Sequence, residues 1–71
     1  MYIVIEIQTN ADGTVGTIIT QWNDRQQAES KFHAILAYAA ASELPVHSAV
    51  ILTNDGLLLR NESYTHGEAR V

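Results

Sequence analysis

The chain has 71 residues, among them four Lys or Arg, eight Asp or Glu and no Cys. This length allows one domain, and a domain so small buries only about 60% of its unfolded surface, which leaves it marginally stable alone. Without Cys there is no disulfide, thiolate zinc site or Cys nucleophile, so self-association becomes the favoured source of extra stability. The net charge of −4 and the scattered basic residues argue against nucleic-acid binding through a basic surface.

Charged residues make up 17% of the chain, below the ~25% of ordinary domains, whereas hydrophobic residues make up 46%. We therefore expect a partner to cover part of the surface. Residues 1–6 lack the basic start and apolar length of a signal peptide, and the longest wholly apolar stretch, residues 35–41, falls short of the ~20 residues of a membrane span. The expected location is the cytoplasm, with no membrane partner.

Residues 1–8 and 15–22 predict two strands that form an antiparallel hairpin. Both segments are rich in β-branched residues. In the first segment, aliphatic residues recur at every second position, which is typical of a strand. Its odd positions form a fully aliphatic face, whereas its even positions are apolar at Tyr2 and Val4 and then polar. The reversal is expected at Asp12 and Gly13, since Gly tolerates a positive φ and Asp suits turn geometry.

A helix is predicted from Asn23 or Asp24, either of which can cap the free N–H groups of the first turn, to about Ser42. Pro45 prevents its continuation. Apolar residues at helical spacing form the expected core stripe: Ala28, Phe32, Ile35, Leu36 and Ala39.

Residues 46–53 and 57–64 predict a second hairpin, closed by a tight turn with Gly56 in the left-handed conformation. In this hairpin we expect Leu52 opposite Leu58, Ile51 opposite Leu59 and Val50 opposite Arg60. Residues 65–71 carry no pattern and are expected to be a disordered tail.

The expected fold is α+β, a two-layer β-β-α-β-β domain over residues 1–64, with one helix on one face of a four-stranded, mostly antiparallel sheet. The first and third strands are the most aliphatic and should lie in the centre, which gives the spatial order 2-1-3-4. One helix cannot cover both faces of such a sheet. The uncovered face is predicted to be an interface, with the candidate residues Tyr2, Val4, Trp22, Val50, Leu52 and Leu58.

Two alternatives to this interface remain open. A twisted second hairpin could leave its tip half covered on both sides. The helix also carries a second face of small residues, Ser30, Ala34, Ala37 and Ala41, which is either a contact surface or a solvent face made of good helix formers.

No motif predicts a catalytic, cofactor or metal site. His33 follows Glu29 by four residues, so the two share a helix face and form either an ion pair or two ligands of an incomplete metal site. Glu6, alone among the acidic residues, lies in a central strand. It could pair with Arg60 or be a solvated charge that prevents edge-to-edge pairing of strands.

These features name no function. The leading hypothesis is a small non-enzymatic interaction module that forms a homodimer through the second face of its sheet. The first alternative is an adaptor or inhibitor, of a kind frequent in bacterial and phage-derived genomes, that binds another protein. The second is a weak metal- or ligand-binding protein that uses His33 and Glu29.

Overall fold

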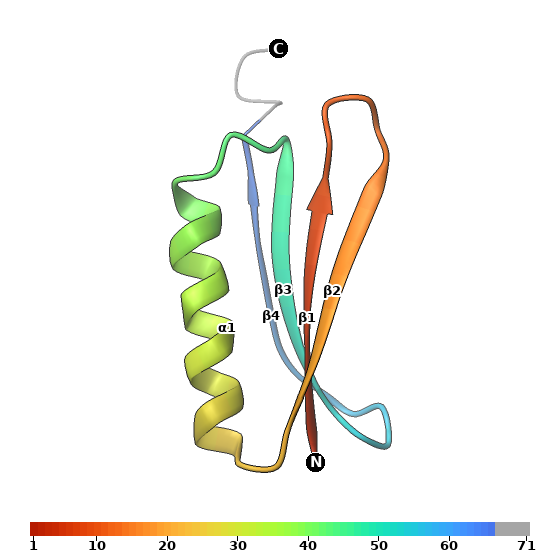
Figure 1. The fold of residues 1–71 in the computed structure, drawn as a ribbon, viewed down its shortest axis with the longest axis vertical. Helices are drawn as coiled ribbons and strands as arrows, with labels where there is room; N and C mark the ends of the chain where they lie inside the picture. Colours follow the sequence, from red (N-terminus) through yellow and green to blue (C-terminus); the bar gives the residue numbers. More distant parts are fainter. Residues whose placement is uncertain (67–71) are drawn as a thin grey trace.

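A computed structural model describes residues 1–66 of the chain. Its elements, in chain order, are β1 (Tyr2–Thr9), β2 (Val15–Trp22), α1 (Arg25–Ala40), β3 (Val46–Thr53) and β4 (Leu58–Thr65). The strands form one antiparallel sheet in the order β2-β1-β3-β4, and α1 packs against one side of it, mainly on β3 and β1 (Figure 1). The predicted α+β class, element order and strand order are all confirmed.

Both hairpins reverse at a glycine with positive φ, Gly13 at +89° and Gly56 at +92°. A side chain would strain the backbone in this region, which is why glycine is the residue that suits both turns. The carboxylate of Asp12 accepts hydrogen bonds from the backbone and hydroxyl of Thr14, at 3.0 and 2.7 Å. These turns fix where each strand ends.

Asp24, and not Asn23, caps α1. Its backbone is extended and its carboxylate accepts a hydrogen bond from the backbone N–H of Gln26 at 3.0 Å. The helix buries Ala28, Phe32, Ile35 and Ala39, as the stripe predicts, while Leu36 is partly buried beside them.

The register between β1 and β3 decides which side of each strand meets the helix. Val4 lies opposite Ile51, and both are fully buried. Because side chains alternate along a strand, the even positions of β1 and the odd positions of β3 turn toward α1. The aliphatic odd positions of β1 therefore lie on the side away from the helix.

This arrangement corrects part of the predicted interface. Tyr2, Val4 and Trp22 lie on the helix side, where Val4 belongs to the core and the other two pack against it. They do not share a face with Val50 and Leu52. The predicted grouping of these residues on one face is wrong because both faces of β1 begin with apolar residues, and the hydrophobic pattern alone does not say which face the helix covers.

A β-bulge in β4 changes the second hairpin. Leu52 lies opposite Leu58 as expected, but Ile51 lies opposite Arg60 and Val50 opposite Asn61. Leu59 has no partner across the strands, and its side chain packs against the core. The extra residue shifts every later pairing by one.

The fourth strand ends at Thr65, one residue into the segment expected to be a tail. The backbone N–H of His66 donates to the carbonyl of Pro45 at 2.7 Å, and its ring Nε2 lies 2.9 Å from the carbonyl of Ala39. Residues 67–71 lie outside the described part of the chain, so their disorder stays a prediction.

The cap of α1 gives a direct test. Asp24→Ala should lower the free energy of unfolding by about 1 kcal/mol, because the N–H of Gln26 loses its acceptor. Asn23→Ala, one residue earlier, should change it by less than about 0.5 kcal/mol. Urea titration followed by circular dichroism measures both. Equal losses in the two variants would contradict the assignment of the cap.

Candidate functional site

The side of the sheet away from α1, called the open face here, is the most unusual surface of the protein. Its side chains form rows across the four strands: Gln21–Ile3–Leu52–Leu58, Ile19–Ile5–Val50–Asn61, Thr17–Ile7–Ser48–Ser63 and Val15–Thr9–Val46–Thr65. Every one of these side chains is uncharged. The three charged residues in the described strands, Glu6, Arg60 and Glu62, all lie on the helix side.

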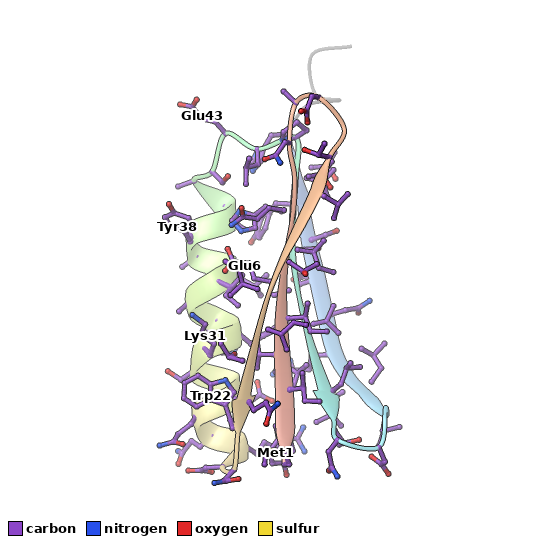
Figure 2. All side chains as sticks on the ribbon, turned by 45° about the vertical axis from the view of Figure 1, so that its right-hand side comes forward. Met1, Glu6, Trp22, Lys31, Tyr38 and Glu43 are labelled. Carbon is purple, nitrogen blue, oxygen red and sulfur yellow. The ribbon has the colours of Figure 1, made fainter. Side chains whose placement is uncertain are left out.

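No element of the described chain covers the open face. Figure 2 shows side chains on both sides of the sheet, with Glu6 between sheet and helix, whereas the side chains opposite project away from the fold. Ile19 is 60% exposed and Leu58 is 50% exposed, while the central Ile5 and Val50 are half-buried by their own neighbours. Of the predicted interface residues, the structure brings Val50, Leu52 and Leu58 together on this face.

The size of the open face suits a protein contact. Four strands spaced ~4.8 Å apart, each of eight residues rising ~3.3 Å, span about 500 Å². Two such faces in contact would bury about 1,000 Å², the lower limit for a specific interface. Nine of the sixteen side chains in these rows are apolar, and exposed apolar patches on soluble proteins commonly mark interaction sites.

A buried polar cluster lies on the opposite side, beneath the helix. The Nε2 of His47 and the Nε2 of Gln8 lie 2.7 and 2.8 Å from the same carboxylate oxygen of Glu6. His47 is fully buried and Glu6 is 8% exposed. The ring of Tyr38 meets the imidazole edge-on at 5.9 Å. Within residues 1–66, the Nδ1 of His47 has no hydrogen-bond partner.

The Nε2 of His47 donates in this contact, because an ionised carboxylate can only accept, and the buried Nδ1 is left without a hydrogen-bond partner among residues 1–66.

Glu6 is held ionised at neutral pH. Burial by itself raises the pKa of this carboxyl group, but hydrogen bonds from Gln8 and His47 and the positive charges of His47 and Lys31 outweigh burial and lower the pKa below its ordinary value of 4.5. The carboxylate is therefore a satisfied part of the core. Nothing in its geometry singles it out as a catalytic base.

Sequence reasoning missed this pair. Glu6 neither pairs with Arg60 nor faces solvent, because the bulge and helix direct Arg60 to Glu29 instead, at 2.8 Å. A signal was present, since Glu6 lies two residues from Val4 and His47 two residues from Ala49, so each shares a strand face with a buried residue. This signal identifies the pair only when the β1–β3 register is known, because the register places both side chains under the helix.

The predicted His33–Glu29 pair exists as a long contact of 3.8 Å on an exposed helix face. Glu29 also accepts from Arg60 and lies 3.6 Å from the Nε of Arg25. A carboxylate already surrounded by cations is poorly suited to a metal ion. In residues 1–66, no three His, Asp or Glu side chains gather as metal ligands would.

The helix contacts β2 less than any other strand, and the surface between them is hollowed. Two open grooves of about 360 and 310 Å³ lie there, and they share Lys31 and Ala34. Trp22 lines one groove and donates from its indole N–H to the hydroxyl of Thr20 at 2.9 Å. The exposed small-residue face of α1 borders these grooves through Ser30 and Ala34.

No protein-family model, curated protein or solved structure matches the chain. None of the helices within residues 1–66 has the length and apolar character needed to cross a membrane.

The buried carboxylate predicts a specific response to acid. A carboxyl group whose pKa is lowered by folding stabilises the fold above its unfolded pKa, and this stability is lost as the pH falls through the folded value. Unfolding free energy should therefore decrease with acidification below about pH 4.5. Glu6→Gln should weaken that decrease, and should cost about 1–3 kcal/mol at pH 7 by disturbing the buried hydrogen bonds.

Urea titrations at several pH values measure the effect. Glu62→Gln is the matched control, because Glu62 ends the same cross-strand row but is exposed. An acid response of Glu6→Gln identical to that of the wild type would show that Glu6 is not the coupled group.

Proposed function

We propose that the protein is a small, non-enzymatic interaction module that self-associates through the open face of its sheet. The observation that carries this proposal is the charge-free composition of that face. The chain holds 12 ionisable Lys, Arg, Asp and Glu residues in all, and those in the described strands lie on the helix side. A surface exposed to water would have no reason to exclude charge so completely.

A second copy is the partner that fits best. The net charge of −4 makes two copies repel, and the repulsion is smallest when they meet through faces without charge. A twofold contact uses the same patch on both copies, so an uncharged apolar face is complementary to itself. The absence of Cys is consistent with a role in the cytoplasm, where disulfides are rare.

The test places one charge at the centre of the open face. Val50→Lys should weaken self-association roughly tenfold or more, because two ammonium groups would be brought into an apolar contact. The monomer should tolerate it, since the lysine stem can extend to solvent. Sedimentation velocity measures the assembly state, and circular dichroism confirms that the variant is folded.

Ala37→Lys is the control, because it places the same charge on the exposed small-residue face of α1. It should leave self-association unchanged. Dissociation by Ala37→Lys and not by Val50→Lys would transfer the interface to the helix. A wild-type chain that is monomeric at every concentration would overturn self-association and favour the alternative adaptor, which binds a different protein.

A further inference from the structure

The two edges of the sheet differ in how they resist pairing with another strand. Natural edge strands are protected by charges, prolines or bulges. β4 has two of these features, the charged Arg60 and Glu62 and the bulge at Leu59. β2 has eight residues, VGTIITQW, with no charge, no proline and no irregularity in its pairing.

The free hydrogen-bonding groups of β2 can be assigned. The N–H of Asn10 donates to the carbonyl of Thr14 at the hairpin end, and hydrogen-bonded pairs alternate along an antiparallel ladder. The backbone groups of Gly16 and Ile18 therefore point toward β1. Those of the odd residues point outward, away from the sheet: Val15, Thr17, Ile19 and Gln21.

Nothing in the described chain shields this edge. Residues 15–19 of β2 are exposed, and α1 leaves open grooves beside the strand. Ile18 is 52% exposed and Ile19 is 60% exposed, although both are large and apolar. A long, uncharged edge of this kind is a template for strand addition.

We propose that β2 pairs antiparallel with β2 of a second copy, which joins the two four-stranded sheets into one sheet of eight strands. With Ile19 opposite itself on the twofold axis, Thr17 lies opposite Gln21 of the second copy, and these outward groups form about six hydrogen bonds. The same register sets Trp22 opposite Gly16. A Cβ on Gly16 would meet nothing within 4 Å, so there is room for the indole beside it.

Two features favour a second copy over a different chain. The strand is complementary to itself, since its largest side chain meets its smallest residue twice across the axis. The contact is also continuous with the proposed interface. A twofold axis perpendicular to the sheet leaves both helices on one side and both open faces on the other, so the charge-free surface doubles in area. This edge contact goes beyond the proposed function, which concerns the open face alone.

Proline substitution separates the two contacts. Thr17→Pro removes an outward N–H of β2 and breaks no bond to β1, so it should abolish edge pairing. Ser63→Pro is the matched control, because Thr17 and Ser63 end the same row at opposite edges and Ser63 also directs its N–H outward. In the Val50→Lys background, which removes the open-face contact, sedimentation velocity should show two chains per particle. Adding Thr17→Pro should give single chains, whereas adding Ser63→Pro should leave two.

Hydrogen exchange in the wild-type protein provides a second measurement that does not depend on the folding of any variant. The outward amides of Thr17, Ile19 and Gln21 should exchange at least about tenfold more slowly than the outward amides of Asn61 and Ser63 in β4. Equally fast exchange at both edges, or single chains in Val50→Lys alone, would overturn edge pairing. The proposal for the open face would stand in either case if the wild-type chain still self-associates.

Discussion

The hydrogen bond between Glu6 and His47 forms only when one particular side of each central strand faces the helix. The two residues lie on adjacent central strands and meet only when the even positions of β1 and the odd positions of β3 turn the same way. Val4 and Ile51 lie on the same face of their strands as Glu6 and His47, and they belong to the apolar part of the core. Reversing β1 would separate the carboxylate from its donor, and a buried imidazole would lose its partner.

This orientation leaves aliphatic side chains of β1 only partly buried in an isolated chain. Burying each aliphatic side chain contributes about 1.5–3 kcal/mol, and the reverse orientation of β1 would bury Ile3, Ile5 and Ile7 while leaving Glu6 in water. The observed orientation does the opposite, and it also leaves Val50 and Leu52 on the open side. A second copy on the open face, as proposed above, would bury this aliphatic surface as well. The polar pair inside and the apolar face outside are then two consequences of one arrangement.

The fold could be predicted because it depends on local signals. Alternation, two Gly turns, a capped helix and Pro45 define the elements, and the aliphatic content of β1 and β3 places them centrally. The orientation of β1 could not be predicted, since both its faces start apolar and the deciding contact joins residues 41 positions apart. The bulge at Leu59 could not be predicted from the sequence for a related reason. It arises where Leu59 packs inward and Arg60 reaches Glu29, and both are tertiary contacts.

The proposed self-association requires that the charge-free open face lies against a second copy. Isotope-filtered nuclear Overhauser spectroscopy on a mixture of labelled and unlabelled chains tests it most directly, because only contacts between copies are detected. We expect signals between the methyl groups of Ile5 and Val50 on opposite copies. Signals confined to Ala34 and Ala37 of the helix, or none at all in a chain that sediments at 7.8 kDa, would contradict it.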